Sequence, residues 1–458
     1  MSSPLAVPSS PASSKRSRSR DSTRSSAATS IAASVNSLAA SVNFSLNPSA
    51  SAPSLIIPHS PSETPSVVGS SPSEAIPYPA FLRQSKLGRG HWLTQAIEIH
   101  QRFIDLEWEQ RNRIAQAQQA GNDPDAPASQ WVRPSGDIVF ARNRYANVDP
   151  YLNNRVKLQV PDGHNDYINA SPIVLKSTDS GTETKFIATQ GPKSDITAHF
   201  WRMIWHETAS PSVIIMLTQT HESGREKCHP YYPLSLDNPT LALNQDDEFE
   251  DGFLSTITLV SLTEDENTRA TIRELEMRDH NGDVKTVWHL LFGGWPDFLV
   301  PEGEDRTALL NLLAMSNEKN GHDAQNPRTV HCSAGVGRSG TFIALDWLLQ
   351  ELDEGSLDDL PEDRDPISEV VDRLRQQRMM MVQGEAQFGF LYEVLRQKWR
   401  ERYWKLHPEV TGEDGLEDGA QTKDIRTGKH QSKKAKADPD EDAHAELEAE
   451  LAGADSSF

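Results

Sequence analysis

Apolar residues recur at helical or strand-like spacing only in the middle of the chain, between about residues 87 and 406. Spacings of three and four residues bring apolar side chains onto one face of a helix. On this basis helices are predicted at 99–114, 196–207, 306–318, 341–352, 366–378 and 386–406.

Shorter apolar runs lie between these helices and predict strands. The predicted strands are 137–141, 155–160, 166–175, 185–190, 213–218, 253–260, 271–277, 284–292 and 329–332. Several of these runs are continuously apolar, as expected for strands that are covered on both faces. The predicted fold class is therefore α/β, with a twisted mixed central sheet flanked by helices on both faces.

The two ends of the chain differ from this middle part in composition. The first 80 residues contain 25 Ser and 11 Pro, and residues 411–458 contain 13 carboxylates against 6 Lys or Arg. Such segments cannot bury enough apolar surface to offset the entropy of ordering. We therefore expect disordered tails at 1–86 and 407–458 around a single folded domain at 87–406, with an acidic surface insertion at about 234–252.

Charge and hydropathy narrow the classes of partner. The chain has 45 Lys and Arg against 66 Asp and Glu, and its net charge of −21 disfavours nucleic acid as a partner. No apolar run approaches the length that spans a bilayer, so neither membrane insertion nor secretion is expected. The sequence predicts an intracellular monomer in the cytoplasm, with the nucleus as a second location.

Only two cysteines, Cys228 and Cys332, occur in the chain. Two are too few for a disulfide framework or for a structural zinc site. A cysteine with a chemical role therefore has to be identified from its neighbours.

The stretch VHCSAGVGRSGTF at 330–342 supports two interpretations. From Gly335 it matches the G-x-G-x-x-G fingerprint of dinucleotide-binding proteins, which needs an acidic residue at a strand end about 20 residues later. The carboxylates near that distance, Glu351 and Asp353, lie on or just beyond a predicted helix instead. The dinucleotide interpretation is therefore disfavoured.

In the second interpretation Cys332 is a nucleophile and Arg338 an anion clamp. Cys332 ends a predicted strand and a helix begins at about Arg338, so loop amides and the helix N-terminus converge on one point. Such an environment favours the thiolate form of a cysteine. The guanidinium fork of Arg338 grips phosphoryl oxygens, and the Ser339 hydroxyl is placed to protonate the departing thiolate.

Further motifs occur elsewhere in the middle of the chain. They are RNRYANV, DYINAS, FIATQGP, KCHPYYP, WPDFLVP and QRMMMVQGEAQF, in that order. Together with HCSAGVGRSG, they resemble the catalytic domain of the classical non-receptor protein tyrosine phosphatases, as found in intracellular members of fungal type. The resemblance covers nearly all of 87–406.

The resemblance implies hydrolysis of phosphotyrosine in proteins through a phosphocysteine intermediate, with no metal ion and no cofactor. Asp297 would protonate the leaving tyrosyl oxygen and later deprotonate the attacking water, which Gln383 would orient. The phosphate would lie in the loop formed by Ser333, Ala334, Gly335, Val336 and Gly337. His331 and Trp295 would support the loop and the acid.

By the same resemblance, Tyr145 would stack on the substrate ring and make the pocket deep enough to prefer phosphotyrosine. Asn147 would hold the substrate main chain, where the family has an Asp. Lys227 would face the acid loop, Glu222 would pair with Arg338, and Gln387 would support Gln383.

Two other departures from the family pattern are Leu299, where a Gly is frequent, and Tyr232, where a Trp is usual. Two alternatives remain at this stage: a catalytically weak module that binds phosphotyrosine, and a dual-specificity phosphatase. The implied partners are tyrosine-phosphorylated proteins of signalling pathways, with a MAP kinase as one candidate.

Overall fold

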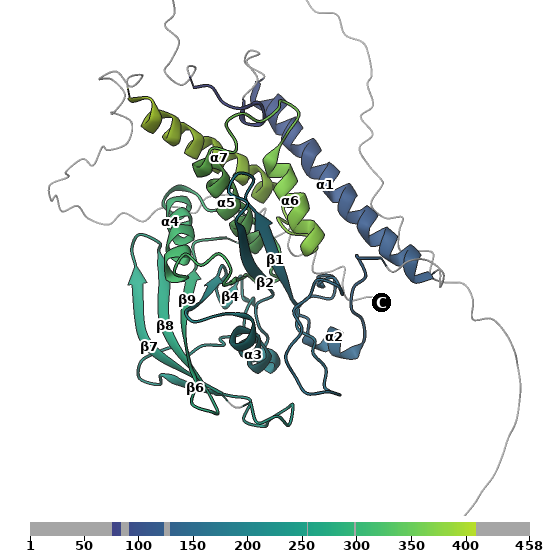
Figure 1. Ribbon diagram of the computed structural model, residues 1–458, viewed down its shortest axis with the longest axis vertical. Helices are drawn as coiled ribbons and strands as arrows, with labels where there is room; N and C mark the ends of the chain where they lie inside the picture. The colour runs from purple at the N-terminus through teal and green to yellow at the C-terminus, as the bar shows by residue number, and fades with distance from the viewer. Residues whose placement is uncertain (1–75, 84–90, 123–128, 254, 297–298, 409–458) are drawn as a thin grey trace, which may run out of the picture. The chain divides into compact units, whose positions relative to one another are not determined.

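Eight strands form one twisted sheet in the order β1–β2–β10–β3–β9–β8–β7–β6 (Figure 1). The computed structural model describes residues 76–83, 91–122, 129–253, 255–296 and 299–408. The strands are β1 Ala170–Lys176, β2 Glu183–Thr189, β3 Ser212–Met216, β6 Thr240–Leu243, β7 Ser255–Asp265, β8 Ala270–Asp279, β9 Val284–Phe292 and β10 Arg328–His331.

The four central strands of the sheet, β2, β10, β3 and β9, run parallel, and the outer strands pair antiparallel. All five residues of β3 are buried, which explains the continuous apolar run 213–216 within it. A separate two-stranded ribbon consists of β4 His221–Glu222 and β5 Arg225–Glu226. The parallel centre matters because the carboxyl ends of such strands open onto one common edge.

Seven α-helices and two short 3-10 turns accompany the sheet in the described part of the chain. They are η2 Ala80–Leu82, α1 His91–Asn122, α2 Asp137–Arg142, η3 Ser194–Ile196, α3 Thr197–Glu207, α4 Gly303–Lys319, α5 Gly337–Glu354, α6 Pro366–Gln377 and α7 Glu385–Leu406. Figure 1 shows α1 beside α6, and the packing of α5 on both α6 and α7 completes one helical layer.

Apolar side chains fill both faces of the sheet. On one face, residues such as Phe186 and Ile215 pack against α1, α4, α5, α6 and α7. On the other face, Trp201 and Ile204 of α3 pack with Ile214 and neighbouring strand residues. The predicted α/β class, mixed sheet and two helical layers are therefore confirmed.

Two predicted strands are wrong. The run 137–141 is part of helix α2, which has no buried residue, and 155–160 forms only an isolated bridge between Lys157 and Tyr167. Both runs have strand-like composition, but neither is inserted between neighbours in the sheet. Val156 and Leu158 of the second run are nevertheless buried in the core, so apolar composition alone does not tell whether a buried segment joins the sheet.

The folded part begins earlier than the predicted boundary at residue 87. Phe81 and Leu82 are buried in the helical core, and Arg396 of α7 donates a hydrogen bond to the Leu82 carbonyl at 3.1 Å. Composition alone places 76–83 in the tail, because residues 76–80 belong to the Ser/Pro-rich stretch. The remainder of both predicted tails, 1–75 and 409–458, lies outside the described residues.

The acidic segment 234–252 is more than a surface insertion, because it supplies the edge strand β6. Its carboxylates also make ion pairs: Glu248 pairs with Arg142 at 3.2 Å, and Asp251 pairs with Arg202 at 2.7 Å. These contacts fasten the segment to α2 and α3.

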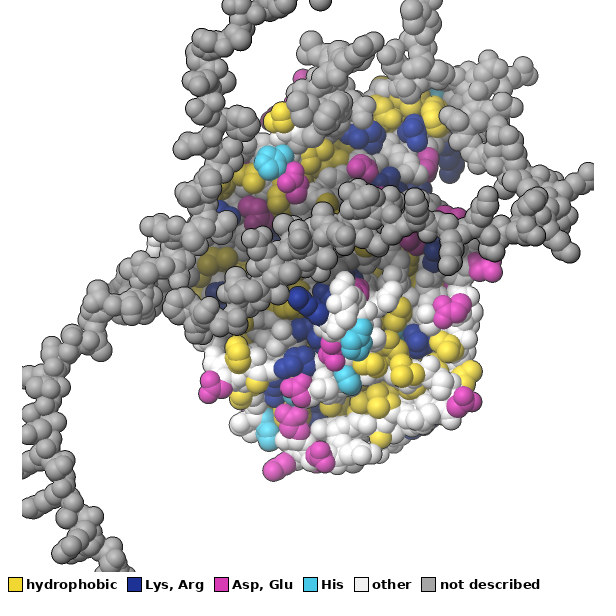
Figure 2. All heavy atoms as spheres, turned by 180° about the vertical axis from the view of Figure 1, so that it is seen from behind, with side chains coloured by type: hydrophobic (Ala, Val, Ile, Leu, Met, Phe, Trp, Pro, Cys, Tyr) yellow, Lys and Arg dark blue, Asp and Glu magenta, His cyan; other side chains and the backbone are white. Residues whose placement is uncertain are grey.

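Charged and apolar side chains are interspersed on the described surface. Seen from behind, basic and acidic side chains lie among apolar ones (Figure 2). No helix within the described ranges is both long enough and apolar enough to cross a bilayer.

The packing of 76–83 yields a stability prediction. Leu82→Ala should destabilise the protein by about 2–5 kcal/mol, because it removes a fully buried side chain and leaves a cavity. Urea unfolding of the full chain measures this change. Leu236→Ala, at a leucine that is 55% exposed, is the matched control and should change stability by less than about 0.5 kcal/mol. Equal losses would show that 76–83 is not part of the core.

Candidate active site

The stretch between β10 and α5 forms a tight loop of residues 332–336, here called the Cys332 loop. Cys332 is 5% exposed, and the Gly335 amide donates a hydrogen bond to its sulfur at 3.3 Å. Gly335 has φ +73°, and a Cβ there would lie 2.0 Å from the Thr189 carbonyl oxygen. Only glycine fits this turn, which lies at the carboxyl ends of the parallel strands and at the N-terminus of α5.

Buried donors hold the outer side of the Cys332 loop. Arg378 donates to the Gly335 carbonyl at 2.9 Å and to the Ala334 carbonyl at 3.1 Å, and the Gly191 amide donates to the Ser333 carbonyl at 2.9 Å. Burial lowers the pKa of Arg378 to about 10, although Tyr167 and Cys332 oppose that effect. These hydrogen bonds fix the three loop carbonyls on the outer side of the loop.

The role of Arg378 was missed in the sequence. It lies in the motif QRMMMVQGEAQF, but a single Arg beside an apolar run resembles a helix-end cation. Only the fold brings it beneath the Cys332 loop, where it is fully buried.

Glu222 holds the guanidinium of Arg338 by two hydrogen bonds of 2.7 Å. The ribbon β4–β5 carries Glu222 to this point, and Arg338 also donates to the Leu217 carbonyl at 3.0 Å. Burial disfavours ionisation of Glu222, but the hydrogen bonds and charge of Arg338 outweigh it and lower the pKa of this carboxyl. A bidentate pair of this kind fixes the plane of the guanidinium beside the loop.

Tyr145 is anchored directly to the Cys332 loop. Its hydroxyl lies 2.8 Å from Ser333 Oγ, and Ser333 Oγ donates to the Lys227 carbonyl at 2.8 Å. Because the Ser333 proton is used in that bond, the Tyr145 hydroxyl is the donor to Ser333. Asn147, two residues along, is exposed at the same rim.

Gln383 and Gln387 lie beside Gly337, the residue that follows the Cys332 loop. A Cβ on Gly337 would meet the Gln387 side-chain amide at 2.9 Å and the Cβ of Gln383 at 3.4 Å. Gln387 is buried and accepts a hydrogen bond from the Gly384 amide at 3.2 Å, whereas Gln383 is exposed. The exposed amide is therefore the one that solvent reaches.

Residues around the predicted acid are only partly described. Trp295 is buried and donates its indole N–H to the Leu299 carbonyl at 3.0 Å, and the Leu299 side chain is 59% exposed. The predicted acid Asp297 lies outside the described residues. Ser339 is fully buried, and its hydroxyl makes no hydrogen bond to another described residue.

A buried chain of three side chains lies behind Cys332. His331 Nδ1 is 3.1 Å from the Cys332 carbonyl, its Nε2 is 2.6 Å from the Tyr231 hydroxyl, and that hydroxyl is 3.0 Å from His289 Nε2. Burial lowers the pKa of His331 to about 4 and that of His289 well below its ordinary value. Both rings are thus neutral at neutral pH.

Neutral rings give the three hydrogen bonds one direction. The Cys332 carbonyl can only accept, so His331 donates from Nδ1 and accepts from Tyr231 at Nε2. The Tyr231 oxygen then accepts from His289 Nε2. The chain links β10, whose last residue His331 precedes Cys332, to β9, which leads to Trp295.

The structure thus brings Cys332, Arg338, Glu222, Tyr145, Lys227, Gln383 and Gln387 together around one loop. Within the described residues, no group of three or more His, Cys, Asp or Glu side chains could hold a metal ion. A thiol at the bottom of an anion site, beside a fixed guanidinium, is suited to attack on a phosphoryl group.

The neutral histidines predict a pH dependence of stability. The pKa of His331 is about 4 in the folded protein against 6.5 ordinarily, so between these values the unfolded chain binds the extra proton. Stability is therefore lost as the pH falls from about 6.5 to about 4. His331→Asn should reduce that slope by up to about 1.4 kcal/mol per pH unit in urea unfolding. An unchanged slope would contradict a neutral buried His331.

Comparisons with known proteins agree with this geometry. A family model described as protein-tyrosine phosphatase matches residues 140–397. Tyrosine-protein phosphatase 1 of Saccharomyces cerevisiae is 37% identical over 287 residues, which cover 58% of this chain and 83% of the yeast protein. The catalytic domain of human protein tyrosine phosphatase non-receptor type 18 has 28% identity and a TM-score of 0.51, covering 67% of this chain and 98% of that domain.

Other relatives are much longer than the matched part. The rat phosphatidylinositol phosphatase PTPRQ is 40% identical over 280 residues, which cover 60% of this chain but 10% of that protein. Tyrosine-protein phosphatase 2 of Schizosaccharomyces pombe is 39% identical over 259 residues, which are 56% of this chain and 34% of the relative. Since the family model covers more than half of the 458 residues, the chain belongs to the protein-tyrosine phosphatase family.

Proposed function

We propose that this protein hydrolyses phosphotyrosine in proteins through a phosphocysteine intermediate. The observation that carries the proposal is the position of Cys332 under the N-terminus of α5, with the Gly335 amide on its sulfur and Tyr145 tied to Ser333 beside it. The first feature suits a nucleophile aimed at an anion, and the second suits an aromatic substrate.

In the proposed first step, the Cys332 thiolate attacks phosphorus and the bond from phosphorus to the tyrosyl oxygen breaks. Asp297 gives its proton to that oxygen, because an unprotonated tyrosyl oxygen leaves poorly. Arg338, whose plane Glu222 fixes, binds the equatorial oxygens as negative charge spreads over them.

In the proposed second step, water attacks the phosphocysteine and releases inorganic phosphate. Gln383 orients this water, and Asp297 takes a proton from it. The Ser339 hydroxyl, which lacks a partner in the described structure, is available to donate to the thiolate as it leaves. Both steps are balanced without a metal ion or an external reductant.

Tyr145 also bears on the choice between substrates. The anchored ring of Tyr145 lines one wall of the site, where it would contact the ring of a bound phosphotyrosine. The side chain of phosphoserine is shorter and has no ring to make this contact, so phosphoserine is disfavoured. One structural relative, PTPN18, was solved in complex with HER2 phosphopeptides, which supports peptide substrates for this chain. Another relative is named a phosphatidylinositol phosphatase, so a phosphatidylinositol phosphate is a suitable comparison substrate in activity assays of this chain.

Wider roles are part of the same proposal and rest on the sequence alone. They are a function in signalling, a cytoplasmic location with the nucleus as a second one, a monomeric state and a MAP kinase among the substrates. A module that binds phosphotyrosine without turnover is the alternative, and the presence of Cys332, Arg338 and Asp297 together disfavours it.

The first activity prediction concerns Cys332. Cys332→Ser should abolish hydrolysis of para-nitrophenyl phosphate and phosphotyrosyl peptides while peptide binding persists, because Arg338 and the loop amides remain. Cys228→Ser is the matched control at the other buried cysteine and should keep turnover. Intact-protein mass spectrometry after acid quenching should find phosphate on wild type and on Cys228→Ser but not on Cys332→Ser. Turnover by Cys332→Ser above the uncatalysed rate would refute this nucleophile.

The second activity prediction concerns Asp297. Asp297→Asn should lower kcat for phosphotyrosyl peptides by roughly 10² to 10⁴, the usual effect of losing general acid–base help. The exposed Asp237→Asn is the control and should leave kcat unchanged. A loss of less than about threefold in Asp297→Asn would assign the acid to another group.

A further inference from the structure

The short helix α2 leaves apolar side chains outside the core. None of its residues is buried; Ile138 is 44% exposed and Phe140 is 73% exposed. This is the same apolar run that the sequence pattern suggested would enter the sheet. A run of this composition that the fold does not bury indicates a surface that something else covers.

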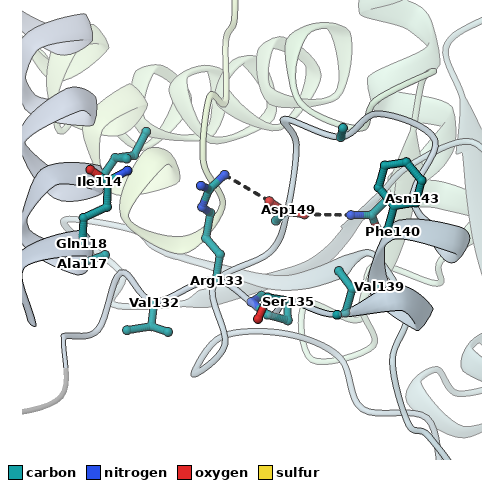
Figure 3. A pocket seen from close by; sticks show the side chains of 13 residues that line it. Ile114, Ala117, Gln118, Val132, Arg133, Ser135, Val139, Phe140, Asn143 and Asp149 are labelled. Carbon is teal, nitrogen blue, oxygen red and sulfur yellow. Dashed lines mark hydrogen bonds and ion pairs between the residues drawn. The ribbon is translucent and has the colours of Figure 1, made fainter. Parts of the chain in front are cut away.

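A groove of about 400 Å³ lies beside α2 (Figure 3). Ile114 and Ala117 of α1 form one wall, Val132 lies along the base, and Val139 and Phe140 of α2 form the facing wall. A space of this size holds a large apolar side chain.

Charges inside the groove cancel one another. Arg133 points at Asp149 and donates to it at 3.1 Å, and Asn143 donates to the second oxygen of Asp149 at 2.7 Å (Figure 3). Both carboxylate oxygens are thereby engaged by the protein itself. The groove therefore carries no net charge that would favour an acidic or a basic ligand. Its apolar walls favour an apolar side chain instead.

The groove adjoins, along the chain, the segment that carries Tyr145. Ala146, which is exposed and lines the groove, directly follows Tyr145, whose hydroxyl is bonded to Ser333 of the Cys332 loop. An extended peptide advances about 3.3 Å per residue, so side chains two to four residues from a bound phosphotyrosine lie roughly 7 to 13 Å from it, a range suited to contacts with the surface next to Tyr145.

We propose that the groove between α1 and α2 is a specificity subsite that takes an apolar side chain, aromatic or long aliphatic, of the phosphotyrosyl substrate. This inference rests on the proposed phosphotyrosine hydrolysis and adds the class of sequence that is preferred. Phe140, Val139 and Ile114 supply the apolar contacts, and the Arg133–Asp149 pair closes the base.

Kinetics of the full chain with matched phosphopeptides test the subsite. In one series a single Phe, Leu, Ser or Glu is placed at each position from four residues before to four residues after the phosphotyrosine. Wild type should prefer Phe or Leu over Ser and Glu at one position by roughly 5- to 20-fold in kcat/KM, as for other apolar pockets. Para-nitrophenyl phosphate, which has no flanking residues, provides the baseline.

Two variants examine the walls of the groove. Phe140→Ala should reduce the preference to within roughly twofold, and Ala117→Trp, which fills the groove, should abolish it. Both should leave hydrolysis of para-nitrophenyl phosphate unchanged. Val260→Ala, at a valine of β7 that is 54% exposed, is the control and should keep the wild-type preference.

The outcomes separate this inference from the proposed function. Hydrolysis of phosphotyrosyl peptides with equal kcat/KM across the series would overturn the subsite and leave the phosphatase activity standing. Failure to hydrolyse para-nitrophenyl phosphate would overturn the proposed function itself. Dimerisation of wild type that Phe140→Ala abolishes would assign the groove to a second copy of the chain and would also overturn the subsite.

Discussion

The shape of the Cys332 loop depends on the hydrogen bonds that Arg378 donates to the Ala334 and Gly335 carbonyls. A buried carbonyl without a partner costs about 1–3 kcal/mol, so these oxygens must be satisfied away from the phosphate site. With the carbonyls turned toward Arg378, the opposite side of the loop is left for amides and the Cys332 sulfur. One buried cation thus makes an anion site possible on the other side of the same backbone.

The remaining parts of the site are arranged around this loop by elements distant in sequence. Glu222 on β4 fixes Arg338, and Tyr145 reaches Ser333 from the segment after α2. Gln387, in the first turn of α7, lies beside Gly337. The His331–Tyr231–His289 chain adds a rigid link from Cys332 to β9, the strand that precedes Trp295. Each of these contacts holds a polar group in one orientation, which is the preorganisation that phosphoryl transfer needs.

Some apolar segments of this chain are buried in the core, and others remain on the surface. The run at 213–218 became β3 because strands on both sides pair with it, whereas the equally strand-like 137–141 became the exposed helix α2. The segment 76–83 shows the converse, because Phe81 and Leu82 are buried although they follow a Ser/Pro-rich stretch. Burial is decided by which neighbours the tertiary fold supplies, and local composition carries no record of them.

The sequence by itself determined the α/β class, most of the strands and helices, and the loop chemistry, because periodicity and the Cys332 to Arg338 spacing are local properties. Only the tertiary structure placed Arg378 beneath that loop, since its partners lie more than 40 residues away along the chain. The His331–Tyr231–His289 chain and the groove beside α2 have the same origin. Long-range packing creates them, and single-sequence patterns report only on neighbours along the chain.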